Sequence, residues 1–377
     1  MKIIHHERKR LASHFSIERL FAEIRGHMPS DCEVESCPSP EASAGILPRW
    51  RNVRHAARQA ADVHHIVGDA HYLAFGLPPE KTVLTIHDCG TLNRLTGLKR
   101  AILKYFWFTG PMRRAAVVTT ISQASKDELR KWVGPLADKV VVVPDCVFED
   151  FAYDPKPFNE ESPVVLQVGT KWNKNVERVM EAVAGTGCRL EVVGELKEEQ
   201  RRGHGLARMD ADRVRAASPT GLEGNARAVG PTALAAGPPN EKETEQEGQS
   251  RFRELGRLTD EELVEAYRRC DMVVFASLYE GFGLPILEAQ AMGRPVITSN
   301  FGAMREAAGD GALLVDPYSV ESIRDAVLRV KNEPGLRAEL VRKGLENAER
   351  FRPEAVAARY GELYRRVRDQ EAKRLKE

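Results

Sequence analysis

The sequence predicts an α/β protein with two doubly wound, Rossmann-like domains that face a cleft. Short β-rich runs alternate with segments of helical period along most of the chain, a pattern typical of parallel sheets covered by helices. The 377 residues suffice for two domains of ordinary size. A connection at 148–163 that contains three prolines (Pro155, Pro157 and Pro163) marks the expected boundary between them.

The first domain is expected to span residues 1–152. Its predicted strands are Thr82–Ile86, Ala116–Thr120 and Val140–Val143, and its predicted helices are Ser16–Ile24, Lys99–Phe108 and Ser125–Val133. We expect Ser125 to cap the last of these helices, because a serine hydroxyl can accept a hydrogen bond from a free N–H of the first turn.

The second domain is expected to span residues 153–352 and to continue the same alternation. Its predicted strands are Val164–Gly169, Arg189–Val193, Phe252–Leu255, Met272–Ala276, Pro295–Thr298 and Ala312–Val315. Its predicted helices are Val176–Ala184, Thr259–Arg268 and Leu284–Met292, followed by three in series at 319–332, 335–350 and 353–372.

Residues 201–250 interrupt this alternation. They contain no Phe, Trp, Tyr or Ile, but seven glycines and four prolines. Such a segment cannot bury enough apolar surface to offset the entropy lost on ordering. We predict a disordered insertion between two strands, with a regulatory or partner-binding loop as the alternative.

Composition excludes several classes of protein. A net charge of +1 argues against a strongly basic nucleic-acid binder, and no run approaches the length of a membrane span. The amino terminus lacks the apolar run of a signal peptide. The six cysteines form no CxxC pair, so neither a zinc site nor a disulfide framework is indicated. The expected location is the cytoplasm.

The segment from Glu280 to Glu288 places two carboxylates on either side of a glycine-containing turn that leads into a helix. Gly281 and Gly283 permit a tight turn and a close approach of a ligand to the backbone. Pro285 fits the first helical turn, whose free N–H groups and dipole favour a phosphate. Glu288 can accept two hydroxyls of a ribose, and Glu280 can reach the group that the phosphate carries. A plain strand-to-helix connection with a solvated Glu is the alternative.

The passage Phe275-Ala-Ser-Leu-Tyr-Glu-Gly-Phe-Gly-Leu-Pro-Ile-Leu-Glu-Ala289, followed by Gly293-Arg-Pro-Val-Ile-Thr298, resembles the nucleotide-sugar site of the retaining glycosyltransferases of family 4. The signature of that family is a Glu, seven residues and a second Glu after a strand. The resemblance covers residues 60–200 and 251–365, and it is more specific in the second half. It implies the GT-B fold, with the last helix, within 353–377, packing back on the first domain.

A second part of the donor site is expected at Gly169 and the turn that follows it. Lysines at the carboxyl edge of a parallel sheet lie where ligands bind in open α/β folds. The resemblance implies that Lys174 and Lys171 stabilise the leaving diphosphate. The alternative for each of them is a solvated surface lysine. The expected donor-binding residues are Gly169, Lys171, Lys174, Glu280, Gly281, Phe282, Gly283, Leu284, Pro285 and Glu288.

The resemblance places the family's active-site histidine at His87, so the expected catalytic residues are His87, Glu280 and Lys174. A packed structural histidine is the alternative for His87. Asp88 is expected to orient the loop. His64 and His65 are adjacent and would face opposite sides of a strand, so they cannot jointly bind a metal. The candidates on the acceptor side are Asp69, Tyr72 and Asp88, with one of the two adjacent histidines.

Residues 89–125 contain six basic residues and no Asp or Glu, with four consecutive aromatic residues at 105–108. A segment of this kind, here 94–114, can lie on an anionic bilayer as a peripheral contact. A core helix with a basic, solvated face fits the pattern slightly better. Where members of the family have an opening strand and a Gly-Gly loop, this chain has a polar start followed by His14–Glu18, so acceptor recognition at that loop is expected to differ.

The expected function is retaining transfer of a hexose from a nucleoside diphosphate sugar to a polysaccharide, oligosaccharide or lipid-linked acceptor in cell-envelope biosynthesis. No metal, other cofactor or nucleic-acid partner is expected, and the enzyme is expected to work in the cytoplasm or at the inner face of the plasma membrane. The resemblance implies front-face attack, with the leaving phosphate taking the acceptor proton. The alternatives are a non-catalytic sugar-nucleotide-binding or envelope-assembly protein and a GT-B epimerase.

Overall fold

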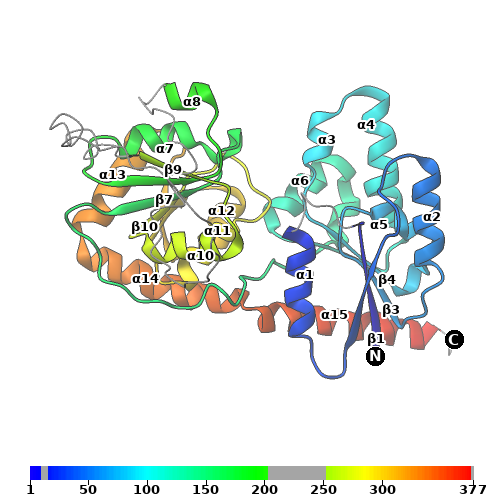
Figure 1. Ribbon diagram of the computed structural model, residues 1–377. Helices are drawn as coiled ribbons and strands as arrows, with labels where there is room; N and C mark the ends of the chain where they lie inside the picture. Colours follow the sequence, from blue (N-terminus) through cyan, green and yellow to red (C-terminus); the bar gives the residue numbers. More distant parts are fainter. Residues whose placement is uncertain (10–15, 203–251, 375–377) are drawn as a thin grey trace, which may run out of the picture.

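The computed structural model describes residues 1–9, 16–202 and 252–374. Two α/β bodies lie side by side, each centred on a sheet (Figure 1). In the described residues each sheet has six strands, and all of them run parallel. This is the GT-B fold of two Rossmann-like domains, as the sequence predicted.

The first sheet has the order β2-β1-β3-β4-β5-β6. Its strands are β1 (Lys2–Glu7), β2 (Glu33–Pro38), β3 (Val63–Ile66), β4 (Thr82–Ile86), β5 (Val117–Thr120) and β6 (Val141–Val142). The helical segments around it are α1 (Ser16–Gly26), α2 (Ile46–Ala56), η1 (His71–Phe75), η2 (Pro79–Lys81), α3 (Gly90–Arg94), α4 (Gly97–Leu103), η3 (Lys104–Thr109), α5 (Gly110–Arg114), α6 (Gln123–Val133) and η4 (Gly134–Lys139). Every residue of β4 is buried, as expected for a central parallel strand covered on both faces.

The interpretation of the amino terminus as a polar start without a strand is wrong. Residues 2–7 form β1, which lies between β2 and β3 inside the sheet. The two histidines that obscured the strand in the sequence are buried, and each has a polar partner. His5 contacts the hydroxyl of Tyr364 at 2.9 Å, and His6 contacts His64 at 3.0 Å. The part of the expected loop at residues 10–15, including His14, lies outside the described residues.

Two predictions about helices also need correction. The helix expected at Lys99–Phe108 is divided into α4 and the π-helical segment η3, after which α5 begins at Gly110. Helix α6 begins at Gln123, and its N-cap is Ser122 instead of Ser125. The Ser122 hydroxyl accepts a hydrogen bond from the Ser125 N–H at 2.9 Å, so the expected cap is the donor of the bond.

The second sheet has the order β12-β11-β10-β7-β8-β9. Its strands are β7 (Val164–Val168), β8 (Arg189–Val193), β9 (Phe252–Gly256), β10 (Met272–Phe275), β11 (Val296–Ser299) and β12 (Ala312–Val315). Its helical segments are η5 (Trp172–Lys174), α7 (Val176–Val183), α8 (Glu198–Arg202), α10 (Asp260–Arg269), α11 (Leu284–Ala291), α12 (Gly302–Ala308), α13 (Val320–Asn332), α14 (Pro334–Ala348) and η6 (Glu349–Phe351). The first two residues of the expected insertion 201–250 end α8, and the rest lie outside the described residues.

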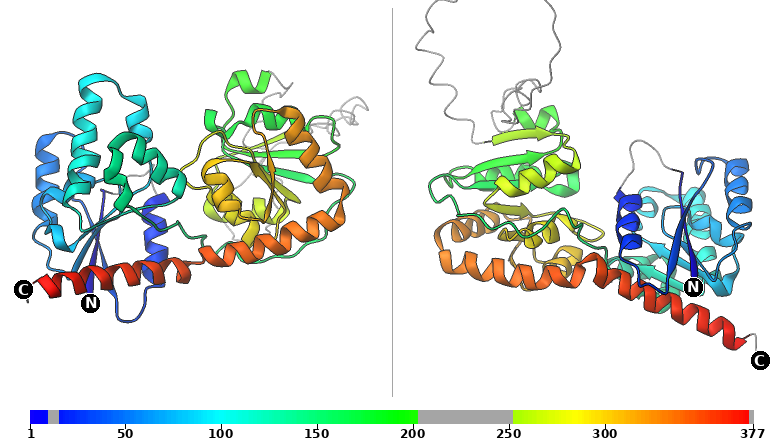
Figure 2. Two further views of the ribbon diagram at one scale, coloured as in Figure 1. Left: turned by 180° about the vertical axis from the view of Figure 1, so that it is seen from behind. Right: turned by 60° about the horizontal axis from the view of Figure 1, so that its bottom comes forward.

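The last helix, α15 (Pro353–Arg374), joins the two bodies. Figures 1 and 2 show it running from the second domain along the first. Its buried Tyr364 hydroxyl lies 2.9 Å from Nε2 of His5 and 2.7 Å from Nδ1 of His65. His65 also contacts the hydroxyl of Thr85 at 2.7 Å. These bonds satisfy polar groups inside an otherwise apolar core and fix α15 against β1 and β3. No helix of the described residues is both long and apolar enough to cross a bilayer.

Candidate functional site

The chain order of the second sheet reverses between β7 and β10. Strands β8 and β9 lie beyond β7, whereas β11 and β12 lie beyond β10. Ligands of open α/β sheets bind in the crevice at the carboxyl ends of the strands, at such a switch point. Two of the predicted catalytic residues follow these two strands. Lys174 ends η5 after β7, and Glu280 lies in the loop after β10.

Lys174 and Glu280 form an ion pair, with 2.8 Å between Nζ and Oε1. The Lys174 ammonium also lies 4.5 Å from the centre of the Phe275 ring. Asn173 holds the same loop, because its Nδ2 donates to the Tyr279 carbonyl at 2.8 Å and to Glu280 at 3.2 Å. Gly169 has a φ of 93°, and a Cβ there would lie 3.0 Å from Lys174 Cε. The lysine is thus held across the switch point, whereas Lys171 is exposed.

Helix α11 begins at Leu284 directly after a sharp turn at Gly283. Gly283 has a φ of 123°, a conformation that side chains rarely adopt, and a Cβ there would lie 3.1 Å from Ile286 Cδ1. Phe282 is buried, and its ring packs 5.7 Å from that of Phe351. Pro285 lies in the first helical turn. The turn therefore leads directly into the first turn of α11, whose free N–H groups and dipole favour an anion.

Glu288 lies one turn into α11 and is buried. Burial raises the pKa of its carboxyl to about 7, although the hydrogen bond from Tyr267 and the charge of Lys174 act in the opposite direction. The Tyr267 hydroxyl donates to Oε2 of Glu288 at 2.6 Å. This bond orients the carboxylate and leaves oxygen lone pairs for a ligand hydroxyl.

His87 follows β4 in the first domain and is half-buried. Its Nε2 lies 3.1 Å from the Val67 carbonyl, which only accepts, so Nε2 carries the proton and donates. The opposite nitrogen, Nδ1, is then the acceptor in the neutral ring. The His87 carbonyl lies 3.5 Å from a Cβ built on Gly281, so the two predicted regions of the site meet across the domains.

The predicted residues of the acceptor side lie in different environments. Asp88 is exposed and accepts a hydrogen bond from the Gly90 N–H at 2.7 Å, which orders the start of α3. Asp69 accepts from Trp107 at 2.8 Å. Tyr72 is buried, with its hydroxyl between Asn52 and Ser43, so the structure does not place it on an open surface. His64 and His65 are both buried and face different partners, as expected for neighbours on a strand.

Several hydrogen bonds connect the two domains beside the loop at 278–283. The Gly281 carbonyl accepts from the hydroxyls of Ser122 at 2.8 Å and Ser125 at 3.0 Å. The Tyr279 hydroxyl donates to Glu128 at 2.6 Å. The Glu306 carboxylate accepts from the first two N–H groups of α6, at Gln123 and Ala124, each at 2.7 Å. The amino-terminal end of α6 is therefore fixed to the second domain.

A cavity of about 420 Å³ opens between the domains next to these contacts. It combines three aromatic side chains with amide, carboxylate and ammonium groups. The lining residues are Asn93, Ala124, Ser125, Glu128, Lys131 and Trp132 from the first domain, and Leu278, Tyr279, Glu280, Phe301, Gly302, Ala303 and Met304 from the second. Aromatic faces beside hydrogen-bonding groups suit the alternating apolar and hydroxylated surface of a sugar.

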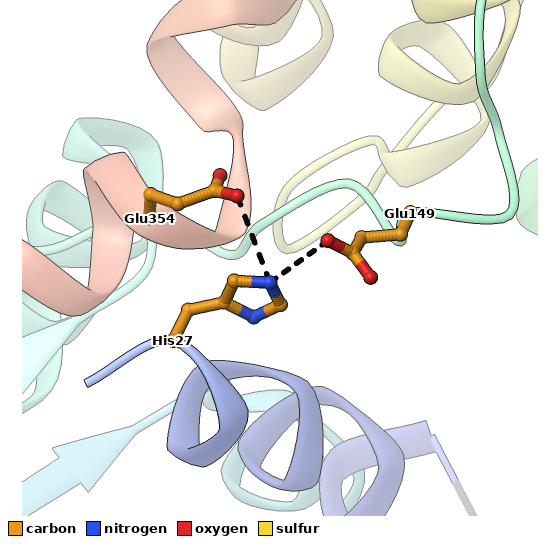
Figure 3. Close-up of side chains that lie close together, drawn as sticks. All are labelled: His27, Glu149 and Glu354. Carbon is orange, nitrogen blue, oxygen red and sulfur yellow. Dashed lines mark hydrogen bonds and ion pairs between the residues drawn. The ribbon is translucent and has the colours of Figure 1, made fainter.

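Within the described ranges, one group of side chains lies close enough together to hold a metal ion, and it is not in the cleft. This group consists of His27, Glu149 and Glu354, which meet near the start of α15 (Figure 3). His27 Nε2 lies 2.8 Å from Glu149 and 3.6 Å from Glu354, distances that an imidazolium between two carboxylates explains. The pKa of His27 is raised, chiefly by its bond to the Glu23 carbonyl. Asp210 and Asp212, two acidic residues separated by one position, lie outside the described residues.

Some residues of the site were not found by sequence reasoning. Tyr267 and Glu306 act through contacts between segments that are distant in the sequence, and no local signal marks them. Asp145 follows β6, at the same edge of the first sheet as His87. Burial raises its pKa to about 6, while the nearby charge of His87 lowers it. Its place shortly after the predicted strand Val140–Val143, with Pro144 between them, was the signal that would have revealed it.

Two family models of glycosyltransferases match this chain. The family model described as Glycosyltransferase Family 4 matches residues 18–150, and the one described as Glycosyl transferases group 1 matches residues 239–347. The O-antigen chain mannosyltransferase B of Escherichia coli is 39% identical over 100 residues, which are 26% of each chain. A serotype-specific mannosyltransferase, WbdA, from the same organism is 27% identical over 290 residues, which are 72% of this chain and 32% of that one. The matches thus span about a third or less of these relatives' length.

The fold is also found among solved structures. The Anabaena protein Alr3699/HepE, solved in complex with UDP and glucose, superposes with a TM-score of 0.66 at 16% identity, over 96% of this chain and 99% of that one. Likeness at this level of identity shows the fold. The two family-model matches, one in each domain, assign the chain to the glycosyl transferases group 1 family with the GT-B fold.

Proposed function

We propose that this protein is a retaining hexosyltransferase that takes a sugar from a nucleoside diphosphate donor without a metal ion. The observation that carries the proposal is the Lys174–Glu280 pair at 2.8 Å, placed at the switch point beside the start of α11. It puts a cation, free N–H groups and a carboxylate where a diphosphate and its sugar would meet. The names of the relatives support a hexose, since they include mannosyltransferases.

In this proposal the donor lies along the carboxyl edge of the second sheet. Glu288 accepts the ribose hydroxyls, and the bond from Tyr267 orients it for that task. Lys174, with the N–H groups of α11 and with Lys171 at the entrance, holds the diphosphate. HepE, solved with UDP and glucose, supports a nucleoside diphosphate as the donor class.

Glu280 and the backbone at Phe282 and Gly283 hold the sugar in the proposed complex. Glu280 is paired with Lys174, so binding of the diphosphate to Lys174 would replace one anionic partner with another and free Glu280 for the sugar hydroxyls. His87, whose backbone carbonyl lies beside Gly281, would hold a sugar hydroxyl from the first domain in this proposal.

The proposed reaction breaks the bond between the anomeric carbon and the donor phosphate and forms a bond to the acceptor oxygen on the same face. Negative charge grows on the leaving diphosphate, and the fixed positive charge of Lys174 and the dipole of α11 stabilise it. The departing phosphate oxygen takes the acceptor proton. Closure of the domains through Gly281 and the α6 serines would keep water from the reacting carbon.

The acceptor is proposed to enter through the cavity between the domains. Trp132 offers a face for a sugar ring, while Asn93 and Glu128 offer hydrogen bonds to hydroxyls. We propose a glycan or a lipid-linked glycan as the acceptor. Because a lipid-linked acceptor lies at a membrane, the proposal includes a peripheral contact of the protein with the membrane through residues 94–114. The expected work in the cytoplasm or at the inner face of the plasma membrane is likewise part of it.

The test starts from donor binding. Calorimetry with UDP-, GDP- and ADP-sugars in the presence of EDTA should identify one nucleotide class that binds the wild type and binds Lys174→Met much more weakly. Transfer from that donor to a glycan extract, followed by NMR of the product, should show the donor's anomeric configuration retained.

Binding without transfer by the wild type to any acceptor would favour the sugar-nucleotide-binding alternative. Conversion of the donor sugar without an acceptor would favour an epimerase. An inverted product would overturn the retaining mechanism.

A further inference from the structure

Exposed apolar side chains gather on one part of the first domain. Of the eleven large apolar side chains that are exposed in the described residues, seven belong to the segments α2, α4 and η3. They are Ile46, Leu47, Trp50, Leu98, Ile102, Tyr105 and Phe106. Ile46 is 88% exposed and Leu98 is 76% exposed. Scattered exposed apolar residues need no explanation, but a cluster of this size marks an interaction surface.

The two parts of the cluster are distant in the sequence and joined in space by aromatic side chains. The guanidinium of Arg49, on α2, lies 4.7 Å from the centre of the Trp107 ring, on η3. The ring of Phe75 lies 5.9 Å from that of Phe106 and 6.5 Å from that of Tyr105. Figures 1 and 2 show α2 at the end of the first domain that is remote from the second domain, with α4 beside it. We call these seven side chains and the basic residues among them the outer face.

The two sequence segments that carry the outer face contain basic residues but no acidic ones. Neither residues 42–61 nor residues 89–125 contain an Asp or Glu. Exposed basic residues occur in both segments, with Arg51 and Arg54 in α2 and Lys99 in α4. Arg54 stacks on the Trp50 ring at 4.7 Å, and Glu41, just before the first segment, pairs with Arg51 at 3.2 Å. The face therefore combines exposed apolar side chains with the exposed basic residues Arg51, Arg54 and Lys99.

We propose that the outer face lies on the surface of an anionic phospholipid bilayer, with both α2 and the α4–η3 segment as its contacts. The apolar side chains would enter the boundary between headgroups and acyl chains, and the Arg and Lys side chains would contact lipid phosphates. This inference adds α2 to the expected segment 94–114. It rests on the proposed function only in giving a reason for the contact, namely an acceptor anchored by a lipid.

The charge also argues against a second copy of this chain as the occupant. A symmetric dimer through the outer face would bring two predominantly basic surfaces together, and the adjacent acidic residues Glu41 and Asp69 are already bonded to Arg51 and Trp107. An anionic bilayer supplies the complementary charge and an apolar layer at the same time.

The outer face adjoins the cavity between the domains. Helix α3, which carries Asn93 of the cavity wall, leads directly into α4. The guanidinium of Arg100, on α4, lies 5.2 Å from the centre of the Trp132 ring, and Trp132 lines the cavity. A lipid-linked acceptor whose chain is in the bilayer would therefore present its head group close to the cavity.

The test is co-sedimentation of the full chain with vesicles, without donor or acceptor. The wild type should bind phosphatidylglycerol–phosphatidylcholine vesicles at least tenfold more tightly than pure phosphatidylcholine vesicles, and 0.5 M salt should weaken the binding. The double variants Ile46→Ser/Leu47→Ser and Leu98→Ser/Ile102→Ser should each reduce binding, and Lys99→Glu should reduce it by about fivefold or more. Tyr318→Ser, which changes a side chain of the second domain that is 60% exposed, should have no effect.

The same measurements contain the results that would overturn the inference. Equal binding of the wild type to charged and neutral vesicles would do so, as would serine variants that bind like the wild type with unchanged melting temperatures. A wild-type dimer that the serine variants convert to a monomer would assign the face to a second copy. Glu280→Gln should bind vesicles normally, so loss of the proposed transfer activity and loss of membrane binding are separate outcomes.

Discussion

The Nζ of Lys174 lies 2.8 Å from Oε1 of Glu280, which joins the loops that follow β7 and β10. Both side chains are mostly buried, with 18% and 15% of their surface exposed. Each side chain therefore depends on the other for charge compensation. In the proposed complex, a donor diphosphate would take the place of Glu280 as the partner of Lys174. A negative charge bound by the lysine after β7 would thus change the position of the glutamate after β10.

Replacement of Lys174 by Met should weaken donor binding and lower kcat by about 10²–10³-fold, because the charge that develops on the leaving phosphate loses its fixed cation. The matched control is Lys171→Met, which removes an exposed lysine of the same turn and should have a much smaller effect. Calorimetry and initial rates measure the two terms. Equal effects at the two positions would show that the ion pair does not mark the functional lysine.

The stability of the protein should depend on the protonation of Glu288. Burial raises its pKa from the ordinary 4.5 to about 7, so the folded state binds this proton more tightly than the unfolded state. The contribution to stability is complete below pH 4.5 and is lost as the pH rises through 7.

Glu288→Gln should remove this contribution, so the difference in unfolding free energy between wild type and variant should change by up to about 1.4 kcal/mol per pH unit between these values. The comparison must be a difference, because burial also lowers the pKa values of His5 and His65, which destabilises the folded protein as the pH falls. Urea unfolding at four pH values measures it. Parallel pH curves for the two proteins would contradict the assignment.

Tyr364→Phe should destabilise the attachment of α15 to the first domain. The change removes one hydroxyl that contacts both His5 and His65, and it leaves buried imidazole nitrogens without that partner. The expected loss is roughly 1–3 kcal/mol of unfolding free energy. Chemical denaturation measures it, with Tyr318→Phe, an exposed tyrosine of the second domain, as the control. A change no larger than in the control would show that packing alone fixes the helix.

Glu306→Ala should favour separation of the domains. The carboxylate of Glu306 accepts from two N–H groups at the start of α6, where the helix dipole also favours a negative charge. Contacts of this kind contribute about 0.3–2 kcal/mol, which corresponds to a roughly 2- to 30-fold shift towards the open form. Small-angle scattering should show a larger radius of gyration than for the wild type. Arg305→Ala, the neighbouring exposed residue of α12, should leave the radius unchanged. A larger radius of gyration for Arg305→Ala than for Glu306→Ala would show that contacts other than those of Glu306 hold the domains together.

Much of the fold followed from local patterns. The apolar-rich runs at β4, β7, β8 and β10 predicted their strands, because parallel strands covered by helices on both faces are rich in Val, Ile and Leu. The same reasoning failed for β1, whose two histidines are polar by type and become acceptable in the core only through Tyr364 and His64. Those partners are separated from it by 359 and 58 positions in the chain, beyond the reach of any local pattern.

The sequence by itself determined that the site contains a glycine turn, a helix start and the pair of glutamates at 280 and 288, because these lie within one short segment whose backbone requirements are local. Only the tertiary structure decided that Lys174 faces Glu280, that Tyr267 orients Glu288 and that α2 contacts η3 through Arg49 and Trp107. Each of these relationships joins segments brought together by sheet order or helix packing. Their geometry follows from the topology of the whole chain, and a local pattern does not contain it.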